Sequence, residues 1–275
     1  PTASLRARLA GRETLVMGIL NVTPDSFSDG GRFVERERAL AHARQMVSEG
    51  ADLIDVGGES TRPGAPEVAE QTELDRVVPI IEALRAESDV PISIDTSKPG
   101  VMREALSAGA NMINDVTALG AAGAIEVVRD ARVPVCLMHM QGTPRTMQAA
   151  PEYADVVDEV GRFLAERAQD CIAAGVHPAD VLLDPGFGFG KTPQHNWRLI
   201  NELQSIVRLG YPVLVGASRK SSIARALDGV TDDRLIGSVT VAAIAARGGA
   251  RVLRVYDVAP TCEALAIVDA LRAGA

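Results

Sequence analysis

The sequence predicts an α/β fold, a closed (β/α)8 barrel, from three observations. Short apolar runs rich in β-branched residues recur along the chain, and helical stretches separate most of them. Strands that are apolar throughout and alternate with helices are typical of a parallel sheet covered on both faces. Eight such units within 275 residues fit a barrel that typically needs about 250 residues. An open, doubly wound sheet is the alternative.

Glycines mark most of the points at which a strand is about to begin. Gly50, Gly109, Gly175, Gly210 and Gly249 each follow a helical stretch and precede an apolar run. Glycine ends a helix at little cost because it adopts the left-handed conformation. In chain order, the expected strands are Leu15–Leu20, Leu53–Val56, Pro91–Ile94, Met112–Ile113, Val133–Met138, Val181–Leu183, Val213–Val215 and Val252–Val255.

Apolar residues at helical spacing indicate the helices between these strands. One apolar stripe comprises Leu74, Val77, Val78, Ile81 and Leu84. A second stripe comprises Leu199, Ile200, Leu203, Ile206 and Val207. The acidic run at 67–75 is interpreted as a solvated helix start. Because no Pro/Ser-rich linker divides the chain, residues 1–275 are expected to form a single domain.

Composition excludes several classes of protein. The hydrophobic fraction of 47% supports a sizeable core and rules out wholesale disorder. A formal net charge of −8 argues against binding to nucleic acid or to an anionic membrane surface. No apolar run of about 18 residues exists that could span a bilayer. The three scattered cysteines form neither a disulfide framework nor a zinc spacing, so we expect a cytoplasmic protein.

Polar residues gather where the predicted strands end. They include Asn21, Glu59, Ser60, Asp95, Thr96, Asn114, Asp115, His139, Asp184, Ser218 and Arg254. In a (β/α)8 barrel these ends share one rim, where active sites lie. The chain's only lysines, Lys98, Lys191 and Lys220, also follow predicted strands. We therefore expect a cationic mouth suited to a small phosphate or carboxylate ligand, although loops carry charges in any protein.

Three loops contain candidate chemistry. The loop at 21–31 is rich in the oxygen ligands that Mg²⁺ prefers, although a polar turn needs the same residue types. The loop at 57–64 presents Arg62, which could bind a carboxylate or phosphate through two hydrogen bonds or simply be solvated. Asp184 ends an apolar strand and is costly to bury without a partner. Its carboxylate could accept two parallel N–H bonds from a 2-amino-4-oxopyrimidine, the edge of a pterin or of guanine.

Taken together, these segments resemble the dihydropteroate synthases. The segments that carry the resemblance are MGILNVTPDSFSDGG (17–31), DVGGESTRPGA (55–65), PISIDTSKP (91–99), NMINDV (111–116), VCLMHMQGTPRTMQ (135–148), LLDPGFGFGKT (182–192), VLVGASRKSSI (213–223) and RVLRVYDV (251–258). They are collinear over nearly the whole chain, and the first, second and sixth are highly specific. The resemblance implies a (β/α)8 transferase of folate synthesis, a sulfonamide target. Such an enzyme joins 6-hydroxymethyl-7,8-dihydropterin pyrophosphate to p-aminobenzoate and releases pyrophosphate with help from Mg²⁺.

The resemblance also implies roles for single residues and an assembly. The pterin would contact Asp95, Asn114, Asp184 and Lys220, in a slot lined by Met138, Phe189 and Gly216. The p-aminobenzoate would lie among Phe27, Thr61, Arg62, Pro63 and Ser218. Asn21 would meet the Mg²⁺ and the pyrophosphate, and Arg254 would bind phosphate. The assembly implied is a homodimer.

One position departs from the family pattern. The family usually has histidine two residues after the arginine of the eighth strand, where it helps to hold phosphate, but this chain has Tyr256. A phenol with a pKa near 10 donates one hydrogen bond and carries no positive charge at neutral pH. We therefore expect weaker pyrophosphate binding, or compensation by Mg²⁺, with activity retained.

Two other functions are compatible with parts of this pattern. A pterin-binding methyltransferase domain that passes methyl from a folate to a corrinoid shares the barrel and the pterin carboxylates. The Ser-Arg-Lys segment at 218–220 and the complete ESTRPG loop favour the synthase. A non-catalytic pterin-binding paralogue is the second alternative, for which Tyr256 is the only positive sign.

Overall fold

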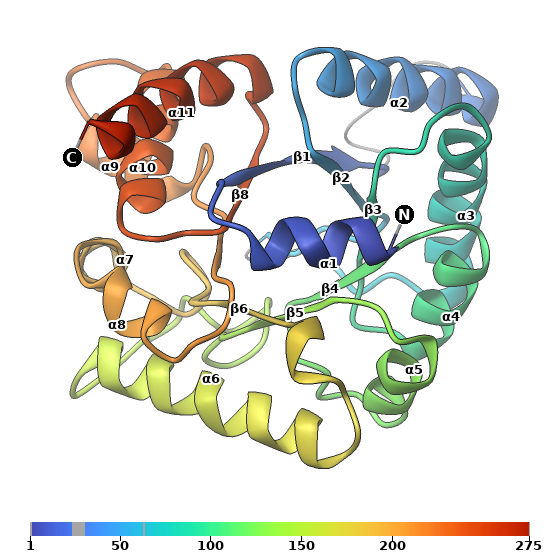
Figure 1. The fold of residues 1–275 in the computed structure, drawn as a ribbon, viewed down its shortest axis with the longest axis horizontal. Helices are drawn as coiled ribbons and strands as arrows, with labels where there is room; N and C mark the ends of the chain where they lie inside the picture. Colours follow the sequence, from blue (N-terminus) through green and yellow to red (C-terminus); the bar gives the residue numbers. More distant parts are fainter. Residues whose placement is uncertain (1, 24–30, 63, 275) are drawn as a thin grey trace.

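The structure is a computed structural model that describes residues 2–23, 31–62 and 64–274. At its centre, eight parallel strands form a barrel (Figure 1). The strands are β1 (Leu15–Asn21), β2 (Leu53–Gly57), β3 (Ile92–Asp95), β4 (Met112–Asp115), β5 (Val135–Met138), β6 (Val181–Asp184), β7 (Leu214–Val215) and β8 (Val252–Val255). They are hydrogen-bonded in the order β6-β5-β4-β3-β2-β1-β8-β7, and a bridge between Leu183 and Val213 joins β6 to β7. The predicted (β/α)8 barrel is confirmed, and the bridge excludes an open sheet.

Helices surround the barrel on all sides (Figure 1). They are α2 (Gly31–Ser48), α3 (Glu70–Glu87), α4 (Pro99–Ser107), α5 (Ala124–Ala131), α6 (Val156–Ala173), α7 (Pro193–Asn201), α8 (Leu203–Val207), α9 (Ser221–Ala226), α10 (Leu235–Arg247) and α11 (Val258–Ala273). The second apolar stripe of the sequence spans two helices, α7 and α8, because Glu202 leaves the helical conformation between them. None of the helices in the described ranges is long and apolar enough to cross a membrane.

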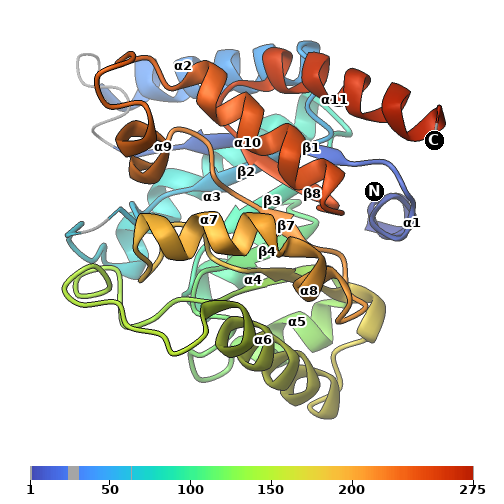
Figure 2. The same ribbon diagram turned by 90° about the vertical axis from the view of Figure 1, so that its left-hand side faces the viewer.

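Successive residues of each strand face opposite sides of the barrel wall. The inner core consists of Leu5, Leu9, Leu15, Met17, Leu53, Met112, Cys136, Leu182, Leu214 and Val252. Outward-facing neighbours such as Val16, Ile54 and Ile113 belong to the larger core between strands and helices. A short helix, α1 (Thr2–Ala10), supplies Leu5 and Leu9 and lies across one end of the barrel, opposite the long loops that follow β2 and β5 (Figure 2).

The alternation of side chains along each strand also turns several polar residues toward the barrel interior. Six residues each stand two positions after a member of the inner core, in the carboxyl-terminal part of a strand or just beyond it: Asp55, Asn114, Met138, Asp184, Gly216 and Arg254. Side chains two residues apart on a strand face the same way. The barrel interior therefore changes from apolar near α1 to charged at the opposite rim.

Candidate active site

A cavity of about 760 Å³ opens at the carboxyl ends of the strands. The predicted site residues that line it are Thr61, Arg62, Phe189, Gly216, Ser218, Lys220, Arg254 and Tyr256. Arg219 and Arg234 line it as well. The predicted residues Phe27 and Pro63 lie outside the described residues. The rim predicted from the polar strand ends therefore contains a cavity, and the segments that follow β2, β5, β6, β7 and β8 contribute residues to it.

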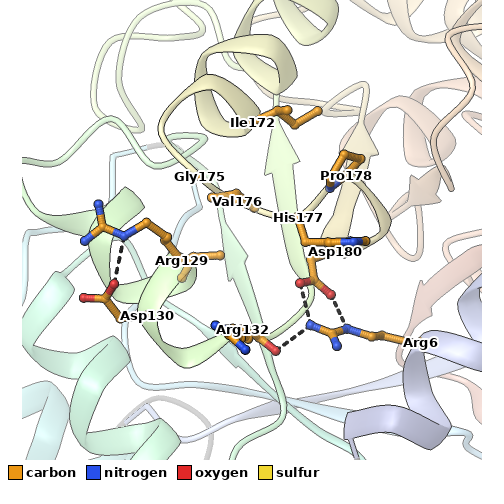
Figure 3. Close-up of a pocket in the computed structure, with 11 residues that line it drawn as sticks. Arg6, Arg129, Asp130, Arg132, Ile172, Gly175, Val176, His177, Pro178 and Asp180 are labelled. Carbon is orange, nitrogen blue, oxygen red and sulfur yellow. Dashed lines mark hydrogen bonds and ion pairs between the residues drawn. The ribbon is translucent and has the colours of Figure 1, made fainter.

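Another cavity, of about 830 Å³, lies near the opposite end of the barrel (Figure 3). It is lined by residues that precede β5 and β6, including Arg132 and Asp180. Arg6 of α1 points to Asp180 and forms an ion pair with it, and it also donates to the Arg132 carbonyl (Figure 3). Because its charged groups are largely paired with one another and barrel chemistry occurs at the carboxyl ends of strands, this cavity is not the candidate site.

Arg254 stands at the floor of the rim cavity between two buried carboxylates. Its Nε donates to Asp55 Oδ2 at 2.6 Å, and its Nη2 donates to Asp95 Oδ2 at 2.7 Å. Asn114 Nδ2 donates to the same Asp55 oxygen at 3.1 Å. These contacts bring β2, β3, β4 and β8 together, so three residues predicted for the site, Arg254, Asp95 and Asn114, form one network.

Asp55 is a member of this network that sequence reasoning missed. It is fully buried, and its second oxygen, Oδ1, has no hydrogen-bond partner among the described residues. Its position two residues after the inner-core Leu53 was the available signal, because that spacing turns the carboxylate inward. In the sequence Asp55 belongs to an apolar strand and begins the segment 55–65, but no role was predicted for it.

Burial perturbs the titration of these groups. Burial raises the pKa of Asp95 to about 7, against the opposing effect of Arg254, and the nearby Asp55 carboxylate adds to the rise. Burial acts to lower the pKa of Arg254, but the charges of Asp55 and Asp95 outweigh it, so the pKa of this guanidinium lies above its ordinary value. The cavity floor thus holds a permanent cation beside a carboxyl group that titrates near neutrality.

Asp184 and Lys220 form the second charged group of the site. Asp184 Oδ1 accepts a hydrogen bond from the Gly186 backbone N–H at 2.7 Å. Burial raises the pKa of Asp184, and Lys220 opposes the rise. Burial lowers the pKa of Lys220 to about 8, while Asp184 opposes that change. Lys220 Nζ lies 4.4 Å from the centre of the Phe189 ring and donates to the Phe187 carbonyl.

The loop 185–190, which connects Asp184 to Phe189, is held by side chains from other segments. Four successive carbonyls, at residues 187–190, accept hydrogen bonds from Lys220, Gln148, Lys191 and Tyr153 respectively. Gly186 has φ +69°, and a Cβ there would lie 1.9 Å from the carbonyl oxygen of His139. The glycine at 186 therefore allows a tightly packed loop that a larger residue would disturb.

Two of the three lysines do not belong to the expected cationic mouth. Lys98 forms ion pairs with Glu59 and Glu73, and Lys191 is buried with its Nζ 3.0 Å from His139 Nδ1. The prediction was wrong for both because acceptors on neighbouring loops take up their ammonium groups. The same contact explains the burial of Glu73, which the sequence assigned to a solvated helix start. Arg234, a cation from outside the motifs, lines the cavity instead.

A hydrogen bond joins Asn21, at the end of β1, to Tyr256, just after the neighbouring strand β8. Asn21 Nδ2 donates to the Tyr256 hydroxyl at 3.0 Å, and the Tyr256 N–H donates to Ser218 Oγ at 3.3 Å. A Cβ on Gly57 would lie 3.7 Å from both Asn21 Oδ1 and Asp95 Oδ2. The amide oxygen of Asn21 and a carboxylate oxygen of Asp95 therefore flank the same side of Gly57.

The comparisons with known proteins agree with one another. The family described as "Pterin binding enzyme" matches residues 17–256. The chain is 51% identical to the dihydropteroate synthase of Haemophilus influenzae over 93% of both chains. It is also 51% identical to that of Escherichia coli strain K12, over 93% of this chain and 90% of the relative.

Solved structures give the same result. A dihydropteroate synthase from Yersinia pestis with a sulfonamide drug complex has a TM-score of 0.90 at 52% identity, covering 95% of each chain. The Xanthomonas albilineans dihydropteroate synthase in complex with 7,8-dihydropteroate has a TM-score of 0.86 at 48% identity, covering 96% of this chain and 98% of that one. Both the sequence and the fold match these proteins over most of the chain, and we conclude that the chain belongs to the dihydropteroate synthases, within the family of pterin-binding enzymes.

Proposed function

We propose that the rim cavity is where this transferase of folate biosynthesis condenses 6-hydroxymethyl-7,8-dihydropterin pyrophosphate with p-aminobenzoate to give 7,8-dihydropteroate and pyrophosphate. The observation that carries the proposal is the convergence of Asp184, Lys220, Asp95, Asn114 and Arg254, from five strand ends, on one rim. Carboxylates and cations gathered in this way suit a flat heterocycle that bears N–H donors and carries a diphosphate.

The pterin is proposed to bind deepest in the cavity. Asp184 accepts N–H bonds from the pyrimidine edge through Oδ2, to which no other group in the described ranges donates. Lys220, Asp95 and Asn114 contact the rest of the heterocycle. The sides of the slot are Met138, Phe189 and Gly216, and the cation of Lys220 over the Phe189 ring holds that aromatic face in place.

The p-aminobenzoate is proposed to bind nearer the mouth, among Thr61, Arg62 and Ser218, together with Phe27 and Pro63, which lie outside the described residues. The Arg62 side chain is exposed at the mouth of the cavity. A guanidinium there matches a benzoate carboxylate through two parallel hydrogen bonds. This orientation directs the arylamine inward, toward the pterin.

Arg254, Asn21 and Tyr256 are the residues that we propose for the pyrophosphate. The Asn21 amide nitrogen donates to Tyr256, so the amide oxygen of Asn21 is the atom that remains for a cation. Such an oxygen fits Mg²⁺, which needs few protein ligands when phosphates supply the others. The described residues contain no cluster of three or more His, Cys, Asp or Glu that would form a complete metal cage. When bound, Mg²⁺ supplies positive charge to the leaving pyrophosphate.

The chemistry that the site must support is cleavage of a C–O bond and formation of a C–N bond. The electron pair of the C–O bond leaves with pyrophosphate, whose new charge Arg254 stabilises. Positive charge develops on the pterin methylene, and the negative charge of the ionised Asp95 carboxylate stabilises it. The neutral arylamine then attacks and loses a proton, so positioning matters more than a strong base.

Rapid quench with p-aminobenzoate omitted tests the order of these steps. Cleavage of the pterin pyrophosphate in the absence of the amine is the result that an ionisation-first reaction requires. If cleavage always requires the amine, the two substrates react in a single displacement.

We further propose a homodimer, a single pterin-binding domain over residues 1–275, and a cytoplasmic location. Ile236 on α10 and Ile267 and Leu271 on α11 are 79%, 65% and 55% exposed, and these two helices pack against each other. Exposed apolar side chains on two packed helices are the candidates that we propose for the association surface. Sedimentation of the wild type beside Ile267→Glu tests the dimer. The three cysteines form no disulfide with one another, which favours a reducing compartment.

Turnover of the pterin pyrophosphate with p-aminobenzoate is the decisive experiment for the function. Product should form with Mg²⁺, fall after chelation with EDTA, and return when Mg²⁺ is added. Pterin binding without turnover under any of these conditions would indicate a non-catalytic paralogue, and methyl transfer from a folate would indicate the alternative enzyme.

A further inference from the structure

The segment 57–69, between β2 and α3, carries Thr61 and Arg62 to the cavity and is held at its base by one carboxylate. Glu59 Oε1 accepts a hydrogen bond from the Val68 backbone N–H at 2.8 Å, which ties the start of the segment to its end. Glu59 Oε2 accepts from Lys98 Nζ. Glu59 therefore closes this segment into a loop and attaches the loop to the β3 side of the barrel.

Lys98 in turn attaches Glu59 to the protein core. Its Nζ donates to Glu73 Oε2 at 2.7 Å, and Glu73 is a fully buried residue of α3. A second contact supports the same base, because Arg76 Nη1 donates to the Gly58 carbonyl at 2.7 Å. The backbone at Gly58 lies against α3 so closely that a Cβ there would be 2.7 Å from Val77 and 3.0 Å from Glu73.

The tip of the loop has weaker support than its base. The Gly64 N–H donates to the Pro144 carbonyl at 3.3 Å, and the Arg62 N–H donates to Ser60 Oγ at 3.4 Å. No residue in the described ranges makes a hydrogen bond or ion pair with the guanidinium group of Arg62. The position of Arg62 over the cavity is consequently set from the base, where the charged side chains that anchor the described part of the loop are Glu59, Lys98, Glu73 and Arg76.

We propose that Lys98 is a positioning residue for the arylamine substrate: by joining Glu59 to the buried Glu73, it sets where Thr61 and Arg62 stand over the cavity. Lys98 is not among the residues that line the cavity, and its ammonium group is engaged by Glu59 and Glu73. It follows Asp95 by three residues in the chain, so the segment that supplies a pterin contact also anchors the loop for the second substrate. This inference rests on the proposed role of Thr61 and Arg62 at p-aminobenzoate.

Lys98→Met removes the charge and keeps the length of the side chain. We expect the KM for p-aminobenzoate to rise about tenfold, as loss of a charged hydrogen bond implies, while the KM for the pterin pyrophosphate stays within about twofold. Hydrogen exchange of the backbone amides at 57–69 should become faster. Arg44→Met is the matched control, because it breaks an ion pair with Glu87 on the outer helices and should change neither KM.

A second variant separates positioning from stability. Lys98→Met leaves Glu73 buried without its partner, which destabilises the protein by itself. The double variant Glu73→Gln/Lys98→Met removes that buried charge and should recover stability toward urea, yet the raised KM for p-aminobenzoate should persist because Glu59 remains detached. Full recovery of that KM in the double variant would overturn the inference.

The measurements also separate this inference from the proposed function. Unchanged exchange at 57–69 in Lys98→Met, an unchanged KM for p-aminobenzoate, or an equal rise in KM for both substrates refutes the positioning role while the wild-type enzyme still turns over. If the wild type forms no dihydropteroate, the proposed function fails, and hydrogen exchange still reports whether Lys98 holds the loop.

Discussion

Gly186 links the anchoring of Asp184 to the packing of the loop that follows it. Its φ of +69° costs an alanine about 1–2 kcal/mol. In addition, the new Cβ would lie 1.9 Å from the His139 carbonyl oxygen, a distance that must grow to at least 3.0 Å. The loop or strand β5 must therefore move by roughly 1 Å in Gly186→Ala.

That movement acts directly on the pterin site. The Gly186 N–H holds Asp184 Oδ1 at 2.7 Å, and the His139 N–H donates to the Asp184 carbonyl at 3.0 Å, so neither segment can shift without displacing Asp184. A displacement of about 1 Å at a substrate-positioning group costs up to about 100-fold in rate. We expect kcat/KM for the pterin pyrophosphate to fall by about this factor, and the free energy of unfolding to fall by about 3 kcal/mol or more.

Gly210→Ala provides the control for the backbone contribution. Gly210 has φ +89°, and a Cβ there would meet no atom within 4 Å. Gly210→Ala should therefore lower the free energy of unfolding by only the backbone cost of about 1–2 kcal/mol and leave turnover normal. Urea denaturation and steady-state kinetics of both variants give the comparison. Equal destabilisation by the two substitutions, with normal kcat/KM in Gly186→Ala, would refute the argument that the close approach to His139 positions Asp184.

Three further predictions concern single groups of the site. Asp184→Asn should weaken pterin binding roughly 100-fold, because the new amide presents a donor to the pyrimidine N–H groups. Calorimetry with the pterin checks this, and Asp158→Asn on the surface of α6 is the control that should bind normally. Tyr256→His should tighten pyrophosphate inhibition about fivefold at pH 6 and less at pH 8, because imidazole gains charge below its usual pKa of about 6.5; an inhibition constant that is the same at both pH values would contradict it. Burial raises the pKa of Asp95 to about 7, so this group takes up a proton on folding at pH values between its ordinary pKa of 3.8 and about 7. Its contribution to the free energy of unfolding is therefore fully present below pH 3.8 and is lost as the pH rises through about 7. The difference in unfolding free energy between the wild type and Asp95→Asn, measured in urea from pH 4 to pH 8, should therefore shift against the wild type as pH rises, and a pH-independent difference would count against a raised pKa.

The local patterns of the sequence predicted the architecture because they depend on neighbours only a few residues away. Glycines after helical stretches and short apolar runs marked all eight strands, and the helical spacing of Val77, Ile81 and Leu84 indicated the buried face of α3. The assignment of a rim followed from the barrel, since parallel strands end at one edge.

The electrostatic state of that rim did not follow from the sequence. Lys98, Lys191 and Lys220 occupy equivalent places after strands, yet only Lys220 lines the cavity, because the acceptors of the other two come from Glu59, Glu73, His139 and Phe189. Asp55 is the opposite case, a charged residue of the site that the sequence did not indicate. Nothing in its apolar strand shows that its carboxylate meets Arg254, which is 199 residues away in the chain.

By itself the sequence determined the barrel, its rim and the family, since periodicity, turn residues and motifs are properties of short stretches of chain. Only the tertiary structure decided which charged groups face the cavity and which hold loops in place. The physical reason is that a buried charge is stable only beside its partner, and those partners lie on segments that the closed barrel alone brings together.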